Sequence, residues 1–282
     1  MDSSINPQEL YVALRDSTRA TVGKYESAVL PIFSREHGRF KALATCVLLD
    51  IDRALYLVTA AHVLDKRESL TLYAYRSPNL FSLNGWSVST PPPSNDRDAD
   101  RIDIAIYRVP AEDVQLLSSA TAIQVRDFSK DLSTATSKSY AVLGYPYSKN
   151  KRAFHRTQEQ GKMKLSLAAY GGNGVVPSED EARRLNLSPQ QHLLIDHAPK
   201  KLIDGKGEFT NSLGFPGMSG GAVFSLGNLG ENTNPSPTAG KLAAIMIEHH
   251  AKPALVVTVR IDLIAQMIRA EMMRPNSVLA RN

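Results

Sequence analysis

The stretch Gly217-Met218-Ser219-Gly220-Gly221 decides how the rest of this chain is interpreted. A serine hydroxyl is a weak nucleophile until a base removes its proton, and the oxyanion that then forms needs backbone N–H groups aimed at it. Small residues on both sides of a serine let the backbone turn tightly, so the N–H groups of Gly217 and Ser219 can point into one hole. We therefore predict that Ser219 is a nucleophile with an oxyanion hole beside it. The alternative is an ordinary glycine-rich turn.

A base for this serine is expected at His62. It ends the string Thr59-Ala60-Ala61-His62, which follows the apolar run 54–58 directly. The histidine therefore stands where a strand ends, after two small residues that pack closely. Most of the seven histidines of a chain like this are structural or exposed, and His62 is selected by this setting.

The acid that orients the base is expected at Asp103, in the string Asp103-Ile104-Ala105-Ile106. A carboxylate at the head of an apolar strand is half buried, where it accepts the imidazole N–H and holds its tautomer. Asp98 and Asp100 are nearby alternatives. Asp103 is preferred because the apolar run begins directly after it.

Strand-like runs dominate the chain and helices do not alternate with them, which favours an all-β, antiparallel architecture. The runs expected to be strands are 43–49, 54–58, 70–75, 102–109, 139–145, 163–168, 192–195, 221–224, 242–247 and 254–261.

Three helices are expected from their start signals. The first begins at Asn6-Pro7-Gln8-Glu9 and ends before Gly23. The second follows a capping box formed by Ser178 and Glu181, and the third runs over 262–273 before Pro275. Segments 84–101 and 227–240 are rich in Pro, Gly, Asn and Ser and are expected to be exposed connections.

The three motifs, in the order His, Asp, Ser, resemble the trypsin/chymotrypsin-like serine peptidase superfamily, especially its bacterial intracellular members. Gly144-Tyr145-Pro146 after an apolar strand is similar to a motif of those branches. The resemblance implies two six-stranded antiparallel β-barrels, with the active site between them, and a C-terminal helix. It divides the chain into a helical N-terminal extension (1–25), a barrel carrying His62 and Asp103 (26–125) and a barrel carrying Ser219 (126–282).

The chain departs from the secreted members of that superfamily in two places. No Ile-Val-Gly-Gly string precedes the first barrel, and Met218 stands where those members have an aspartate. We therefore expect a serine endopeptidase that is not an ordinary zymogen activated by N-terminal insertion. A regulatory or activating protein partner is then expected, and the segment 1–23 is a candidate docking element for it.

The resemblance also implies which residues meet the substrate. Leu213, six residues before the serine, is expected at the base of the primary specificity pocket, and Ile247, Glu248 and His249 are expected to face the substrate backbone. An apolar floor favours apolar substrate side chains. Glu248 would favour basic ones if it faced the pocket, and the alternative is that it points to solvent.

Composition limits the location and the cofactors. Cys46 is the single cysteine of the 282 residues, so no intramolecular disulfide forms and a reducing compartment, the cytoplasm, is expected. Residues 1–23 lack the apolar segment of a secretory signal. Cys46 is expected to be buried and not nucleophilic. His249 and His250 are adjacent in a strand and point to opposite faces, so neither a metal nor a cofactor is expected.

Two other functions compete with the peptidase. One is a catalytically idle fold of the same type that serves as a protein-binding scaffold, against which the intact His62, Asp103 and Ser219 speak. The other is nucleic-acid binding, suggested by a net charge of +5 and a pI of about 9.2. The densest basic run is interpreted as a solvated loop, so we expect neither a nucleic acid nor a membrane as partner. That run comprises Lys149, Lys151, Arg152, His155, Arg156, Lys162 and Lys164.

Overall fold

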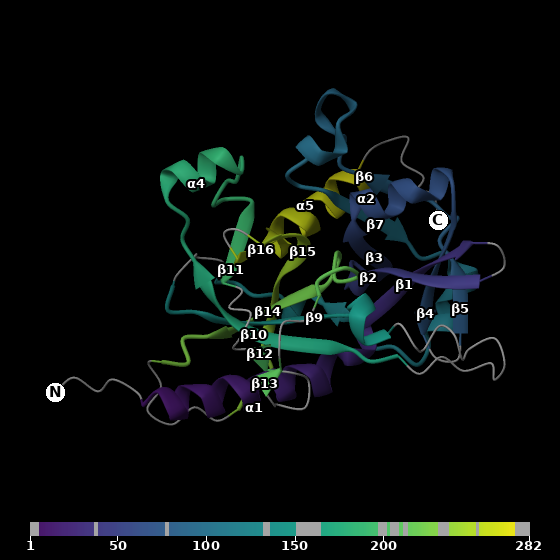
Figure 1. The fold of residues 1–282 in the computed structure, drawn as a ribbon. Helices are drawn as coiled ribbons and strands as arrows, with labels where there is room; N and C mark the ends of the chain where they lie inside the picture. The colour runs from purple at the N-terminus through teal and green to yellow at the C-terminus, as the bar shows by residue number, and fades with distance from the viewer. Residues whose placement is uncertain are drawn as a thin grey trace.

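A computed structural model of the chain describes residues 6–36, 39–76, 79–131, 136–150, 165–196, 202–203, 209–210, 214–230, 237–251 and 254–273. These residues form two β-sheet units side by side, with helices along their outer surfaces (Figure 1). The basic run predicted at 149–164 lies outside the described residues, apart from Lys149 and Asn150 at its start.

The N-terminal unit is an eight-stranded sheet in the order β5-β4-β1-β2-β3-β7-β6, with β8 pairing parallel to β2. The strands are β1 (Val29–Glu36), β2 (Arg39–Ile51), β3 (Ala54–Ala60), β4 (Thr71–Arg76), β5 (Asn79–Ser82), β6 (Ser87–Ser89), β7 (Ile104–Arg108) and β8 (Ile123–Gln124). No pairing joins β5 to β6 among the described residues, so a closed first barrel is not found. Closure requires the end strands to pair at a matching tilt and stagger, and these two strands are the short ones of the main path.

The C-terminal unit is a closed barrel in the order β10-β11-β16-β15-β14-β9. Its strands are β9 (Ser139–Gly144), β10 (Ala168–Val175), β11 (His192–Asp196), β14 (Ala222–Gly227), β15 (Lys241–Ala251) and β16 (Ala254–Arg260), and a separate small hairpin joins β12 (Leu202–Ile203) to β13 (Phe209–Thr210). The expected second six-stranded barrel is therefore confirmed. The expected strand at 163–168 is wrong, because residues 165–167 are not in a strand and β10 begins at Ala168.

The helices begin where their caps predicted. Helix α1 (Pro7–Tyr25) starts at Asn6, whose side chain accepts from the N–H of Gln8, and α4 (Glu179–Arg184) has the reciprocal capping box of Ser178 and Glu181. The other helices that lie wholly within the described residues are α2 (Ala61–Leu64), α5 (Ile261–Met272) and the 3₁₀ turns η1 (Glu26–Ala28), η2 (Asp65–Glu68), η3 (Pro93–Asn95), η4 (Arg97–Ala99), η5 (Ala111–Leu117) and η6 (Val125–Asp127).

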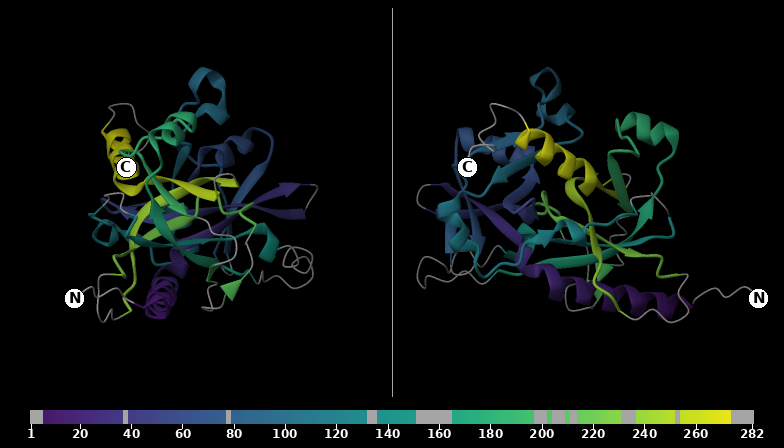
Figure 2. Two further views of the ribbon diagram at one scale, coloured as in Figure 1. Left: turned by 60° about the vertical axis from the view of Figure 1, so that its left-hand side comes forward. Right: turned by 180° about the vertical axis from the view of Figure 1, so that it is seen from behind.

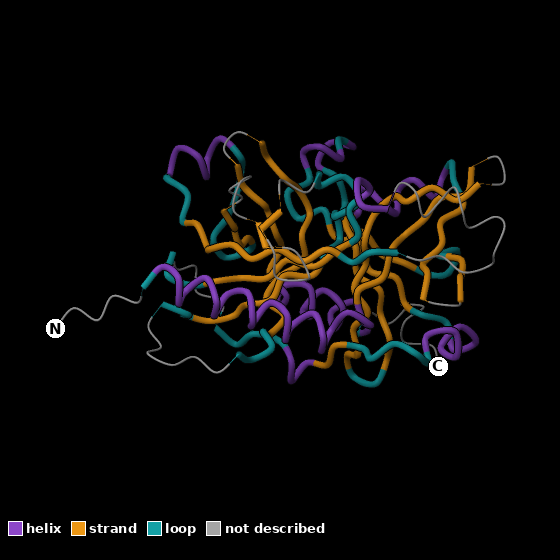
Figure 3. Tube along the Cα trace, turned by 60° about the horizontal axis from the view of Figure 1, so that its bottom comes forward, coloured by secondary structure: helices purple, strands orange, loops and turns teal. Residues whose placement is uncertain are grey.

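Helix α1 runs past Gly23, where it was expected to end, because its last turn is packed against the barrel. The ring of Tyr25 stacks on Phe224 of β14 with 4.6 Å between ring centroids. The helix lies along one side of the barrel strands and α5 lies on the other (Figure 2). The view from below shows α1 crossing the strands of the C-terminal unit (Figure 3). Packing of a buried face thus extends the helix beyond what local propensity predicts.

The segment 84–101 is not the wholly exposed connection that was expected. It contains β6, η3 and η4, and the side chains of Thr90 and Asp100 are buried. Arg97 bonds both Asp100, at 2.6 Å, and Asp65, at 2.7 Å. Ion pairs therefore order this polar segment where an apolar pattern is absent.

Candidate active site

The pairing of β3 with β7 brings His62 and Asp103 together. Ala60, the last residue of β3, pairs antiparallel with Ile104, the first residue of β7. The residues that follow β3 and precede β7 must then lie side by side, and the N–H of Ala61 donates to the carbonyl of Asp103 at 2.8 Å. The two sequence motifs are neighbours because of this register.

The carboxylate of Asp103 makes two contacts with His62. Its Oδ2 lies 2.6 Å from Nδ1 of the imidazole, and its Oδ1 accepts from the backbone N–H of His62 at 2.9 Å. The carboxylate is buried, whereas the imidazole is 36% exposed. A carboxylate facing Nδ1 keeps the proton on that nitrogen, so Nε2 is the nitrogen able to accept a proton.

The backbone of Asp103 has an unusual conformation, with φ of +43°. Among residues other than glycine, Asp and Asn enter this left-handed region most readily, and such conformations concentrate at functional sites. The turn at Asp103 directs the carboxylate back toward the end of β3.

The two alternative acids lie elsewhere. Asp100 accepts hydrogen bonds from Thr90 and Arg97, and its Oδ1 accepts from the N–H of Ile102 at 3.0 Å. Asp98 is exposed in η4. Among the described residues, Asp103 is the carboxylate in contact with the imidazole of His62.

The loop 215–221 is held by hydrogen bonds within itself and by hydrogen bonds to three neighbouring segments. These segments are strand β2, strand β15 and the turn that follows strand β9. The bonds run from Met218 N to Phe215 O (2.8 Å), Tyr147 N to Pro216 O (2.7 Å), Thr45 Oγ1 to Gly217 O (2.8 Å), Gly221 N to Met218 O (2.8 Å), Thr45 N to Ser219 O (2.9 Å) and Gly220 N to Met246 O (2.7 Å).

Two N–H groups of this loop stand apart from that set. No acceptor within the described part of the chain takes the N–H of Gly217 or of Ser219, whereas the N–H groups of Met218, Gly220 and Gly221 all donate. In a trans peptide the N–H points away from the preceding carbonyl. The carbonyl of Pro216 accepts from Tyr147 and that of Met218 from Gly221, so the N–H groups of Gly217 and Ser219 each point away from these bonds.

Glycine is required where this loop meets the N-terminal sheet. Gly220 has φ of +84°, and a Cβ there would lie 2.0 Å from the carbonyl oxygen of Thr45 and 2.4 Å from Oγ1 of Thr59. Thr59 stands three residues before His62. Ser219, which is partly exposed, therefore lies beside the end of β3 from which the histidine follows.

Three of the four residues predicted to meet substrate are described, and they are consecutive in β15. Leu213 lies outside the described residues. The strand pairing shifts between Met246 and Glu248, so Ile247 is the extra residue of a β-bulge, and its side chain is buried. The ring of His249 stacks on Phe215, with 4.0 Å between ring centroids.

Glu248 has two charged neighbours. Its Oε2 lies 3.4 Å from Nη1 of Arg101 and 3.3 Å from Nε2 of His250, and its side chain is 41% exposed. The carboxylate therefore joins β15 to the segment just before Asp103. It is neither isolated in solvent nor an unopposed acidic group.

His192, at the start of β11, was predicted only as part of a strand. It is buried, its Nδ1 accepts from the N–H of Ser188 at 2.9 Å and its Nε2 lies 2.8 Å from the carbonyl oxygen of Arg101. Burial lowers the pKa of His192 below the ordinary histidine value. The residue thus connects the barrel to the segment that carries Asp103, and its lowered pKa favours the neutral ring.

Cys46 is fully buried beside Thr45, and burial raises the pKa of its thiol. A thiol in such surroundings is not a nucleophile. Among the described residues, no group of three or more His, Cys, Asp or Glu side chains is arranged to hold a metal ion. None of the helices in the described ranges is both long and apolar enough to cross a membrane.

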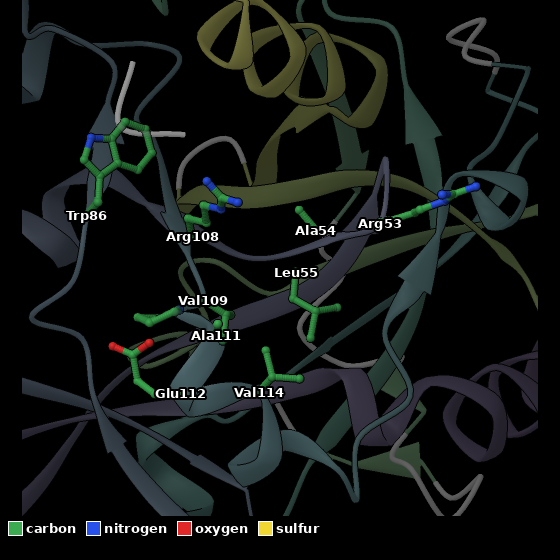
Figure 4. Close-up of a pocket in the computed structure, with 10 residues that line it drawn as sticks. Arg53, Ala54, Leu55, Trp86, Arg108, Val109, Ala111, Glu112 and Val114 are labelled. Atoms are coloured by element: carbon green, nitrogen blue, oxygen red, sulfur yellow. The ribbon is translucent and has the colours of Figure 1, made fainter. Parts of the chain in front are cut away.

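A pocket of about 480 Å³ lies away from these residues, at the opposite ends of β3 and β7. It is lined by Ala54, Trp86 and Arg108, among others, and the side chains of Arg53 and Arg108 point in different directions (Figure 4). The lining does not converge on one point, and the pocket is separate from the candidate site.

Comparison with known proteins supports the same superfamily. The trypsin-like peptidase domain matches residues 44–229. A search among curated proteins found no significant match. The chain resembles the crystal structure of the serine endoprotease from Yersinia pestis, with a TM-score of 0.53, 15% identity and coverage of 93% of this chain and 68% of that one.

A second similar structure is the HtrA-type protease AlgW with a tripeptide, with a TM-score of 0.51, 12% identity and coverage of 93% of this chain and 65% of that one. The chain thus spans about two thirds of the length of each structure. At these identities the likeness concerns the fold. The domain match covers more than half of the residues, and the chain therefore belongs to the trypsin-like serine peptidase superfamily.

Proposed function

We propose that the chain is a serine endopeptidase in which Ser219 is the nucleophile, His62 the general base and Asp103 the residue that orients the base. The observation that carries the proposal is the 2.6 Å contact between His62 and Asp103, next to a loop whose N–H groups at Gly217 and Ser219 are unused by the described residues. Each part of the acyl-transfer machinery is thus represented in one region.

The reaction follows from these positions. Oγ of Ser219 attacks the carbonyl carbon of a peptide bond while its proton passes to Nε2 of His62. The N–H groups of Gly217 and Ser219 receive the negative charge that develops on the carbonyl oxygen. Collapse of the intermediate breaks the C–N bond, and His62 gives its proton to the departing amine. Water then hydrolyses the acyl-enzyme by the same proton transfers in reverse order.

Two further properties belong to the proposal. The single, buried cysteine supports function in a reducing compartment, the cytoplasm. Met218, which is buried in the loop, offers no carboxylate to a new N-terminus, which supports a form that needs no N-terminal cleavage. A protein partner that regulates access to the site fits both a cytoplasmic location and a form that needs no N-terminal cleavage.

A fluorophosphonate probe, which phosphonylates an activated serine, tests the proposal. The wild-type protein, Ser219→Ala and the exposed control Ser118→Ala should be compared with and without cell lysate. We expect labelling of the wild type and of Ser118→Ala and none of Ser219→Ala. Equal labelling of Ser219→Ala would assign the nucleophile elsewhere. A folded wild type that stays unlabelled even with lysate would favour the idle scaffold.

A further inference from the structure

We propose that Thr45 of β2 is a positioning residue of the oxyanion hole. This inference rests on the proposed function, because it names the group that holds the hole in shape. Thr45 is fully buried and bonds the two residues, Gly217 and Ser219, whose N–H groups no acceptor in the described part of the chain takes.

The direction of the hydroxyl bonds of Thr45 is fixed by chemistry. The N–H of Tyr145 can only donate, and it donates to Oγ1 of Thr45 at 2.9 Å. The hydroxyl hydrogen is therefore available for the carbonyl of Gly217, which lies 2.8 Å away. The side chain is an acceptor on one side and a donor on the other.

The backbone of Thr45 completes the arrangement. Its N–H donates to the carbonyl of Ser219 at 2.9 Å, and its own carbonyl accepts from Oγ1 of Thr59 at 2.7 Å. Thr45 thus bonds the carbonyls of both Gly217 and Ser219. Each bond fixes the peptide that follows one of the two oxyanion donors.

Loss of the hydroxyl should act on the transition state. Gly217 has φ of +94°, and glycine has wide conformational freedom, so its peptide depends on external bonds to stay in place. Valine has the shape of threonine but neither donates nor accepts. An oxyanion hole that is less well ordered stabilises the tetrahedral intermediate less, while the ground-state substrate is bound as before.

Thr21 of α1 provides a matched control. It is also fully buried, its hydroxyl donates to the carbonyl of Ser17 at 2.7 Å, and it accepts from the N–H of Gly240 at 2.9 Å. Thr21→Val therefore removes one donated and one accepted hydrogen bond, as Thr45→Val does. The hydroxyl of Thr21, however, makes its bonds to Ser17 and Gly240 and not to the loop 215–221.

The experiment compares Thr45→Val, Thr45→Ser and Thr21→Val in the full chain. Peptide hydrolysis gives kcat and KM, and amide hydrogen exchange over 214–221 gives a readout that needs no activity. We expect Thr45→Val to lower kcat roughly 10- to 100-fold, with KM little changed, since the effect on the hole is indirect. Thr45→Ser should restore most of kcat. Thr21→Val should lower the melting temperature and leave kcat unchanged.

Two results would overturn the inference: an unchanged kcat in Thr45→Val, or an equal loss of kcat in Thr21→Val. If Thr45→Val does not fold, Thr45→Cys, with its weaker donor, should give a kcat between those of wild type and an inactive enzyme. If the wild type is neither active nor labelled by the fluorophosphonate probe, the proposed function fails. Hydrogen exchange then still decides the role of Thr45, because unchanged exchange over 214–221 in Thr45→Val contradicts it.

Discussion

Asp103 holds His62 by two bonds from one carboxylate, at 2.6 Å to the ring nitrogen Nδ1 and at 2.9 Å to the backbone N–H. The second bond fixes which oxygen faces the backbone, and the first then fixes the ring. The orientation of the imidazole and its protonated nitrogen are therefore set by a single side chain. Replacement of that side chain by its amide tests both effects.

Asp103→Asn should fold and lose turnover by about four orders of magnitude. The backbone N–H of His62 requires an acceptor, so the amide oxygen should occupy the place of Oδ1. The amide NH₂ then faces Nδ1, which must become the unprotonated nitrogen, and Nε2 carries the proton and cannot act as a base. Steady-state peptide hydrolysis measures the loss. Asp98→Asn, at an exposed position, should retain normal turnover, and an equal loss there would refute the assignment.

Ser219→Ala and His62→Ala should each be nearly inactive, and the double variant should be no worse than either alone. The two side chains perform one proton transfer, so removal of one already eliminates the contribution of both, a loss on the order of 10⁴–10⁶ in turnover. The kcat values of the single and double variants make the comparison. Strictly multiplicative losses would show that the two residues act independently.

Gly220→Ala should destabilise the protein by at least about 2 kcal/mol through strained backbone and overpacking. The added Cβ would lie 2.0 Å from the carbonyl oxygen of Thr45 at φ of +84°. Gly23→Ala in α1 is the control, because a Cβ there meets nothing within 4 Å. That variant should gain about 0.5–1 kcal/mol from helix propensity. Denaturant unfolding gives both free energies, and a Gly220→Ala protein as stable as wild type would contradict the packing described.

His192 should make the protein less stable in mild acid. Its folded pKa is lowered, so as pH falls through the unfolded value near 6.5 the unfolded state takes up a proton that the folded state does not. The free energy of unfolding should therefore decrease from about pH 7 downward until the folded pKa is reached. His192→Asn should show a shallower decrease between about pH 7 and 5. An identical pH profile in the two proteins would show that His192 does not contribute.

Cleavage should follow medium apolar residues such as Leu, Val or Ala, and be poor after Arg or Lys. Leu213, which we propose as the base of the primary specificity pocket, offers no carboxylate to a substrate cation, and the carboxylate of Glu248 already lies 3.4 Å from Arg101. A peptide library reports the preference of the wild type and of Glu248→Gln, which should be alike. A dominant preference for Arg or Lys that disappears in Glu248→Gln would show that Glu248 lines the pocket.

The features set by local sequence were predicted well. The caps at Asn6 and Ser178 located the starts of α1 and α4, and compact apolar runs located β2, β3 and β16. Strand β1 was missed because Pro31 and the polar ending Ser34-Arg35-Glu36 obscure its pattern, although pairing with both β2 and β4 stabilises it. Strand β10 was predicted too early in the chain, at 163–168. Its true span contains three glycines and an asparagine, residues that are depleted in strands.

The candidate site residues were also predicted from local sequence, whereas their arrangement depends on tertiary contacts. The motifs around His62, Asp103 and Ser219 selected residues whose relation depends on strand register and on loop contacts that no local pattern reports. Thr45 was not predicted as a site residue, although it is the polar residue in the apolar run Leu43–Leu49 and precedes Cys46 directly. A buried hydroxyl within an apolar strand needs partners, and that requirement was the signal available.

The open N-terminal sheet has a consequence for association between copies of the chain. A closed barrel has no edges, whereas an open sheet ends in strands whose unpaired backbone groups can recruit a strand from another molecule. Among the described residues, the strands at the two ends of this sheet are β5 and β6, which have four and three residues. Strands this short present few vacant N–H and C=O groups. Within the described part of the chain, each end of this sheet therefore offers little backbone for edge-to-edge pairing.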